Sequence, residues 1–385
     1  MSFFQLRLTN KQKKAFHFCN HLKLRLGRKE MFLKKFISAL TLGRIKFLSY
    51  SPILYGIGAT IATFQGEKFN LSYFLLGQIT VWITHMMTHF YNEYYDLDTD
   101  KINEHPSPWT GGSRILPKGI LSPQTSMRLA VFTTIVSFGL SLLMPSFETR
   151  LICWVSLILS WGYSAPPLAL CRRGLGELIT TIVLNVLTPL LGFLLQNGNL
   201  YPGRTRVLFL VLLPLAIIEY VRMMVMNMPD RDCDSAVGKN TLIVKIGMNR
   251  AVQIHAMGML VAYLSLAFIY QYSDVPLVVV LLILSTAPLG FLTTLWVYKH
   301  WQDRQKFFTV PFLASTHNAL AALAALIGFL LCHPSGYLLH PETHLKAFSV
   351  YLYLAVFLYF RWASGRRNEQ ELVGWETESQ QQQGV

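Results

Sequence analysis

Nine long, uninterrupted apolar runs constrain the fold of this chain more than any other feature of its sequence. Each is close to the roughly 20 residues that an α-helix needs to cross the hydrocarbon core of a membrane. A closed β-barrel would need strands that alternate apolar and polar residues, and these runs do not alternate. The sequence therefore predicts an all-α, multi-pass transmembrane helix bundle, with spans at roughly 46–64, 71–92, 126–145, 149–165, 177–196, 206–227, 251–271, 275–298 and 310–332.

The composition agrees with a membrane protein. Only 14% of the residues are charged, against about 25% in a typical soluble domain. The five cysteines show no CxxC spacing, so neither a disulfide framework nor a zinc site is predicted. A tenth apolar segment lies near 347–362. We therefore divide the chain into a basic arm at 1–44, a transmembrane domain at 45–332, an extra C-terminal helix within 333–363 and a disordered polar tail at 364–385.

The first 46 residues are strongly basic, with twelve Lys/Arg and a single acidic residue, Glu30. Apolar residues such as Phe16, Leu22 and Phe36 interleave with these charges. This pattern is typical of a segment that rests on anionic lipid, so the expected partner is the bilayer and not nucleic acid. A mitochondrial transit peptide has a similar composition. The sequence thus predicts an integral protein either of a bacterial inner membrane or, if the arm is a transit peptide, of an organelle membrane.

Acidic residues are scarce and concentrated in two stretches. Seven of the 20 lie within 92–100 and 230–234, each directly after a long apolar segment. In the first stretch Asn92, Asp96 and Asp100 recur every fourth residue and would share one helical face, whereas Asp98 points elsewhere. Asp230 and Asp234 repeat the spacing. Stacked carboxylates repel one another, and a hard cation such as Mg²⁺, which takes one or two carboxylates plus phosphate oxygens, would stabilise them.

A basic, glycine-containing loop follows each acidic stretch: residues 110–119 after the first and 238–242 after the second. Backbone amides of glycine together with Lys or Arg, next to metal-binding carboxylates, suit a diphosphate group. An even number of spans separates the two stretches, so both should face the same side of the membrane. The loops and helix ends expected there carry thirteen Lys/Arg against five on the other side, which predicts that this is the inner side, cytoplasmic or matrix.

With these features, the chain resembles the UbiA superfamily of intramembrane aromatic prenyltransferases over roughly residues 42–332. The first aspartate-rich motif is matched by Asn92-x-x-x-Asp96-x-x-x-Asp100, and the second by Asp230-x-x-x-Asp234. The loop 111–116 looks closer to the menaquinone-type branch, which prenylates dihydroxynaphthoate, than to the hydroxybenzoate branch. Asp232 and Pro229 depart from the second motif, and Pro229 is expected to unwind the helix end before Asp230. The basic arm and the tenth helix lie outside the usual nine-helix pattern.

The resemblance implies an Mg²⁺-dependent enzyme that transfers a prenyl group from a prenyl diphosphate to a carbon of an aromatic acceptor. The acceptor would be a quinone precursor such as a dihydroxynaphthoate or a hydroxybenzoate. On this interpretation the metal ligands are Asp96, Asp100, Asp230 and Asp234, and Asn92 and Tyr163 complete the catalytic set. The residues expected to bind diphosphate are Lys101, Arg114, Lys118, Lys239, Arg44, Lys46 and Asn227.

Other polar residues inside the spans remain open. His85 and His89 fall on the stripe of Asn92 and Asp96, and are either packed core residues or part of the site. Glu219 and Arg222 form either a functional pair or a structural ion pair. Two further classes of protein also fit intramembrane charges and duplicated halves: a transporter, and a non-catalytic isoprenoid-binding protein of the same fold. Acids at helix ends beside basic loops favour the enzyme.

Overall fold

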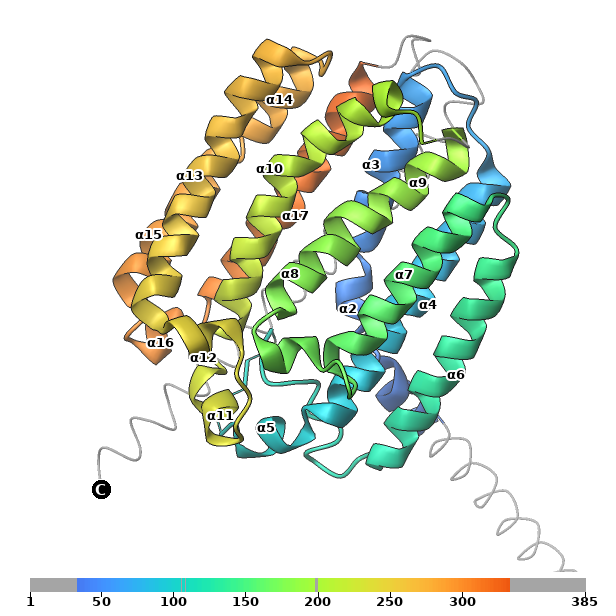
Figure 1. Cartoon of the computed structure of the whole chain (residues 1–385). Coiled ribbons are helices and arrows are strands. Elements are labelled where there is room, and N and C mark those ends of the chain that lie inside the picture. The colour runs from blue at the N-terminus through green and yellow to red at the C-terminus, as the bar shows by residue number, and fades with distance from the viewer. Residues whose placement is uncertain (1–32, 105, 108, 198–199, 333–385) are drawn as a thin grey trace, which may run out of the picture.

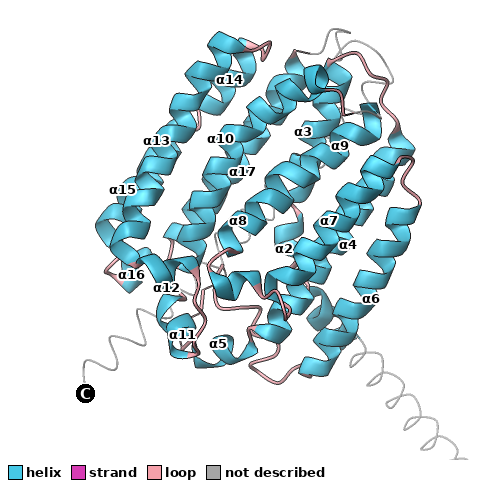
Figure 2. Cartoon of the chain, viewed as in Figure 1, coloured by secondary structure: helices cyan, strands magenta, loops and turns pink. Residues whose placement is uncertain are grey.

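The computed structural model describes residues 33–104, 106–107, 109–197 and 200–332. Within these ranges the chain consists of helices and connecting loops, without strands (Figure 2). This confirms the predicted all-α fold. The tenth helix near 347–362, the polar tail and most of the basic arm lie outside the described residues.

Each of the nine predicted spans coincides with a helix or with consecutive helices of the described chain. In order, these are α2 (Ile45–Leu48) with α3 (Ser51–Phe64), α4 (Leu71–Tyr95), α6 (Pro123–Leu142), α7 (Phe147–Ser164), α8 (Gly176–Thr181) with the π-helical turn η2 (Ile182–Leu187) and α9 (Thr188–Asn197), α10 (Pro202–Asn227), α13 (Met248–Tyr272), α14 (Leu277–Leu284) with α15 (Ala287–His300), and α17 (Val310–Leu331). The shorter elements are α5 (Leu97–Ile102), η1 (Leu170–Arg173), α11 (Arg231–Ala236), α12 (Leu242–Ile246) and α16 (Arg304–Phe307).

Local chemistry explains where the observed helices depart from the predicted spans. Helix α6 starts three residues before the predicted 126 because Ser122 caps it, accepting a hydrogen bond from the Thr125 amide. The predicted span 275–298 is broken between α14 and α15, where Pro288 stands at the second position of α15. The predicted span 177–196 contains the turn η2 just before Pro189, a residue that has no amide to donate.

Seven of the helical segments in the described chain are long and apolar enough to cross a membrane. Helices α4 and α7 do not meet this criterion, and α4 carries polar residues such as Thr84, His85 and His89 along its length. Apolar side chains on outer helices face outward: Phe132 and Ile135 of α6 are 63% and 65% exposed, and Leu260 of α13 is 60% exposed. Such surfaces suit contact with lipid.

Small residues let central helices approach closely. A Cβ added to Gly58 of α3 would lie 1.8 Å from the carbonyl oxygen of Pro189, and one added to Gly192 of α9 would lie 2.2 Å from the carbonyl oxygen of Tyr55. Both glycines are therefore required where α3 crosses α9, as is common between membrane helices. This crossing joins the first helix to the middle of the chain.

The short helices that carry the two acidic stretches lie side by side at one end of the bundle. Helix α5 follows α4 and α11 follows α10, and these two short helices are in contact (Figure 1). The sequence predicted that both stretches face one side, and this is confirmed. Before α2, residues 33–42 are also helical, with Leu33 and Phe36 half exposed, as expected for a segment at a membrane surface.

Candidate active site

The first motif continues in helical register across the junction of α4 and α5. Asp96 ends α4 and precedes α5; its amide donates to the Asn92 carbonyl, and the Asp100 amide donates to the Asp96 carbonyl. The Asn92 side chain donates to Asp96 Oδ2 at 2.6 Å. Asp96 and Asp100 are both buried, whereas Asp98 is exposed on the opposite face. The predicted stripe of Asn92, Asp96 and Asp100 therefore exists.

The helix that leads into the second motif ends just before Asp230, as the presence of Pro229 led us to expect. Helix α10 ends at Asn227, and Asp230 stands at the start of α11. The chain recovers its register there, since the Asp234 amide donates to the Asp230 carbonyl at 2.8 Å. Asp234 is 2% exposed, while Asp232 points to solvent and pairs with Arg231.

Lys239 joins the two motifs. Its ammonium lies 3.0 Å from Asp96 Oδ2 and 3.3 Å from Asp234 Oδ1, and its side chain is buried. Asp96 Oδ2 and Asp234 Oδ1 can therefore be no farther apart than the sum of these two distances, although 138 residues separate the two aspartates in sequence. The Lys239 ammonium therefore lies between two carboxylates, a position that a bridging metal ion could also take.

The glycine loop after α5 packs against both motifs. The Gly111 amide donates to Asp230 Oδ2 at 3.3 Å, and the Asn103 side chain donates to Asp230 Oδ1 at 2.9 Å. Gly112 has a φ of 76°, and a Cβ added there would lie 2.2 Å from Asp100 Oδ2. Glycine is therefore required at 112, both for its left-handed backbone and for the close approach of the Asp100 carboxylate.

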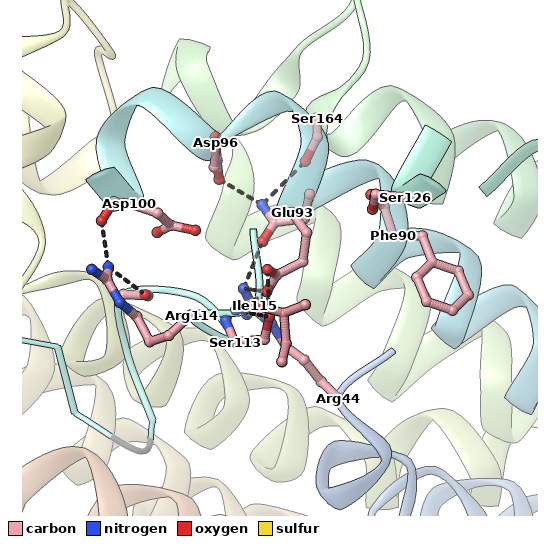
Figure 3. Close-up of polar contacts among 12 residues, drawn as sticks. Arg44, Phe90, Glu93, Asp96, Asp100, Ser113, Arg114, Ile115, Ser126 and Ser164 are labelled. Carbon is pink, nitrogen blue, oxygen red and sulfur yellow. Dashed lines mark hydrogen bonds and ion pairs between the residues drawn. The ribbon is translucent and has the colours of Figure 1, made fainter. Parts of the chain in front are cut away.

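Glu93 organises the site, a role that the sequence analysis did not assign. It is fully buried and accepts hydrogen bonds from Arg44 Nε at 2.8 Å and from the Ser113 amide and hydroxyl at 2.7 Å each. Figure 3 shows Arg44, Glu93 and Ser113 pointing toward one another at the end of α4. Glu93 thus fixes a cation and the glycine loop beside Asp96. The available signal was a carboxylate directly after Asn92 in a chain poor in acids.

Three carboxylates of the site, those of Asp100, Asp230 and Asp234, have raised pKa values. Burial, opposed by Arg44 and aided by neighbouring Glu93 and Asp96, raises the pKa of Asp100 to about 7. Burial likewise raises the pKa of Asp230 to about 6 and that of Asp234 to about 7. Because burial is the main cause, these carboxylates take up a proton, or another cation, more readily than exposed ones do.

These residues fit a divalent metal that is completed by substrate. In the described part of the chain, no three His, Cys, Asp or Glu side chains form a ready metal cage. The carboxylates instead face a shared space, and Asp96 Oδ1 is buried without a hydrogen-bond partner. Mg²⁺ binds through one or two carboxylates and takes its remaining ligands from phosphates and water. The donor set therefore suits Mg²⁺ with a bound diphosphate.

The motifs open into a cavity of about 250 Å³ that extends along α4, α7, η2, α10 and α17. The four motif aspartates line its polar end. The other predicted residues that line it are Arg44, Lys46, Asn92, Tyr163, Asn227 and Lys239. His85 and His89 line it as well, which favours a role in the site over a packed core. Its far end is mainly apolar, with Val81, Leu187 and Leu191.

Three predicted diphosphate-binding residues are not brought into the cavity. Lys101, in the last turn of α5, and Lys118, on the loop that follows α5, are both exposed. Arg114 does not line the cavity; its guanidinium donates to the main-chain carbonyls of Asp100 and Gly111 and so holds the loop (Figure 3). Sequence proximity to the motif suggested these residues, but the chain turns their charges away from the shared space.

Several polar residues within the helices are paired with one another. Arg222 forms a buried ion pair with Glu219, whose Oε2 also accepts from the Asn318 side chain at 2.6 Å. Arg222 and Asn318 line the cavity, whereas Glu219 lies behind them. Asn227 donates to Glu177 at 2.8 Å, a partner that the sequence analysis did not name.

The profile of the UbiA prenyltransferase family matches residues 50–316. The chain belongs to this family. It is an integral membrane prenyltransferase, and the transporter and the non-catalytic protein are thereby set aside. The solved structures of UbiA homologues from Aeropyrum pernix K1 and, bound to DMAPP and Mg²⁺, from Archaeoglobus fulgidus share its fold. They cover 71% and 75% of this chain and 97% and 99% of their own, with 18% and 14% identity and a TM-score of 0.52 each.

Curated relatives of this UbiA-family chain include naphthoate prenyltransferases. A 1,4-dihydroxy-2-naphthoate octaprenyltransferase of Bacillus subtilis is 26% identical over 223 residues, which cover 56% of this chain and 67% of that enzyme. The chloroplastic 2-carboxy-1,4-naphthoquinone phytyltransferase of Arabidopsis thaliana is 24% identical over 246 residues, covering 62% of this chain and 63% of that enzyme. The resemblance to the menaquinone-type branch is confirmed.

Proposed function

We propose that this prenyltransferase is Mg²⁺-dependent and transfers the prenyl group of a prenyl diphosphate to a ring carbon of a dihydroxynaphthoate-type acceptor. The observation that carries the proposal is the convergence of Asp96 and Asp234 on Lys239 at the polar end of a cavity whose far end is apolar. The similarity to naphthoate prenyltransferases supports a naphthoate-type acceptor. The Archaeoglobus fulgidus homologue bound to DMAPP and Mg²⁺ supports a prenyl diphosphate donor and Mg²⁺ as the metal.

The diphosphate head belongs at the polar end in this proposal. Arg44 and Lys239 supply positive charge there, Asn92 and Asn227 supply side-chain amides, and the backbone around Gly111 approaches the same space. Asp96, Asp100, Asp230 and Asp234 would hold Mg²⁺, which neutralises the charge that develops on the leaving diphosphate. The apolar far end accepts the prenyl tail.

The reaction breaks the bond between the prenyl C1 and the diphosphate oxygen and forms a bond between C1 and a ring carbon, which loses a proton. The chain's own residues position the two reactants and keep water from the allylic cation. Aromatic side chains close the polar end: Trp109 packs against Phe47 and Phe312, and Lys46 lies over the rings of Phe47 and Trp109. Ring faces of this kind also stabilise a passing cation.

The test is prenyl transfer by purified protein in vesicles. The experiment supplies prenyl diphosphates of several lengths and a panel of hydroxylated aromatic acids, with and without Mg²⁺. We expect metal-dependent prenylated naphthoate from the wild type and none from Asp96→Ala. Asp98→Ala is the matched control, since Asp98 is exposed two residues away. Product formed in EDTA, or equal product from Asp96→Ala, would refute the proposal.

A further inference from the structure

A second polar cluster lies deeper in the bundle than the aspartate motifs, around Arg222. Its members come from five separate segments of the chain. They are Tyr50 before α3, His85 of α4, Asn185 of η2, Glu219 and Arg222 of α10, and Asn318 of α17. Tyr50, His85, Arg222 and Asn318 line the same cavity as the motif aspartates. The helices that carry them surround the middle of the bundle (Figure 1).

The cluster holds hydrogen-bonding capacity that the protein itself does not use. Asn318 is 2% exposed and donates its amide to Glu219, while its Oδ1 has no partner. His85 Nδ1 and Asn185 Oδ1 are also buried without partners. The Tyr50 hydroxyl lies near the side chains of Asn185 and Asn318 and is buried without a hydrogen bond of normal geometry. Buried polar groups are nearly always paired, so several unpaired groups around one cavity point to a ligand.

The charges of the cluster are balanced. Glu219 neutralises Arg222 and fixes its guanidinium from behind, and Arg222 is close enough to His85 for its charge to act on that ring. A neutral set that offers both donors and acceptors suits a hydroxyl group, which donates and accepts at once. An isoprenoid tail would leave each of these groups unpaired at a free-energy cost.

The position of the cluster fits the acceptor ring. Arg222 lies five residues from Asn227 along α10, and His85 lies eleven residues from Asp96 along α4. At 1.5 Å per residue, the cluster thus lies about 7–16 Å from the diphosphate end, toward the interior of the bundle. The reacting carbon of the donor is bonded directly to the diphosphate. If a substituent of the acceptor ring is held one to three helical turns deeper in the bundle, a ring carbon can reach the reacting carbon of the donor.

We propose that the Tyr50, His85, Arg222 and Asn318 cluster binds a ring hydroxyl of the aromatic acceptor and so orients the ring for attack. The proposal rests on the proposed function, because it assigns the acceptor to one part of that cavity. In this proposal these residues bind the acceptor, and the residues of the two aspartate motifs bind the donor.

The test separates acceptor binding from turnover. Wild type, Tyr50→Phe and His85→Phe are titrated anaerobically with 1,4-dihydroxy-2-naphthoate and with its dimethoxy analogue, in the absence of prenyl diphosphate. We expect each variant to bind the dihydroxy compound about fivefold more weakly, the effect of one lost hydrogen bond, with little change for the dimethoxy compound. In turnover the acceptor KM should rise by the same factor while the donor KM stays constant. Tyr263→Phe, which removes a half-buried hydroxyl that is hydrogen-bonded to Thr286 and His317, is the matched control.

Two results would overturn the inference. An unchanged acceptor affinity in both variants would mean that the cluster holds only water. A change in donor KM or in preferred prenyl length, with acceptor binding unchanged, would assign the cluster to the tail. Failure of the proposed function looks different: the wild type would give no prenylated product, and the binding titration would still report on the cluster.

Discussion

Replacing Lys239 by methionine tests whether its ammonium occupies, in the metal-free protein, the position that Mg²⁺ takes when substrate is bound. The substitution keeps an unbranched side chain of similar length and removes the charge that lies 3.0 Å from Asp96 and 3.3 Å from Asp234. Breaking a buried ion pair by removing one partner costs about 3–5 kcal/mol, because the remaining charges stay buried. We therefore expect metal-free Lys239→Met protein to melt several degrees below wild type at pH 8.

The loss should shrink at lower pH. The pKa of Asp234 is raised to about 7 by burial, so below that pH the carboxylate takes up a proton and no longer needs the ammonium. Added Mg²⁺ should also stabilise the variant more than the wild type, because the metal does not have to displace a lysine. A ligand present at a hundred times its Kd contributes about 2.7 kcal/mol.

The assay is a thermal melt in detergent, in EDTA or with Mg²⁺, at pH 6 and pH 8. Lys245→Met is the matched control, since Lys245 is exposed and donates a hydrogen bond to the Arg173 carbonyl, away from the aspartates. Equal melting of Lys239→Met and wild type in EDTA at pH 8 would refute the argument. An equal Mg²⁺ shift in the two proteins would show that Lys239 does not occupy the metal's place.

Three further predictions concern the same site. Gly112→Ala should lower prenyl transfer at least tenfold by displacing the Asp100 carboxylate, whereas Gly119→Ala, with a similar positive φ but open space around it, should keep near-normal activity; steady-state rates decide. Asp96→Asn should reduce kcat about a hundredfold or more and raise the Mg²⁺ concentration needed for half-maximal rate. Burial raises the pKa of Asp100 and Asp234 to about 7, so their ionisation opposes folding: metal-free protein should be more stable at pH 5.5 than at pH 8, and Mg²⁺ affinity should fall below pH 7. Melting curves and isothermal titration measure these two trends, and a stability that increases with pH would contradict the assignment.

Much of the architecture follows from the sequence alone, because a bilayer leaves a chain few choices. Continuous apolar runs can cross it only as helices, so the nine spans and the shared side of the two acidic stretches could be predicted. A spacing of four residues placed Asp96 and Asp100 on one helical face, and the structure shows that both side chains are buried. Pro229 predicted the end of the helix before Asp230, since proline has no amide N–H with which to continue the hydrogen bonds of α10. These are local properties of the backbone and the solvent.

The identity of the charges that face the site was decided only by tertiary structure. Lys101, Lys118 and Lys239 look equivalent in sequence, each following an acidic stretch, yet only Lys239 turns inward between the two motifs. Long, flexible side chains take the direction that the packing of the surrounding chain gives them, and no local rule fixes it. The same holds for Glu93, whose partners Arg44 and Ser113 are 49 and 20 residues away. Pairings over such distances exist only after the helices have packed, because packing alone sets which buried charges can be compensated.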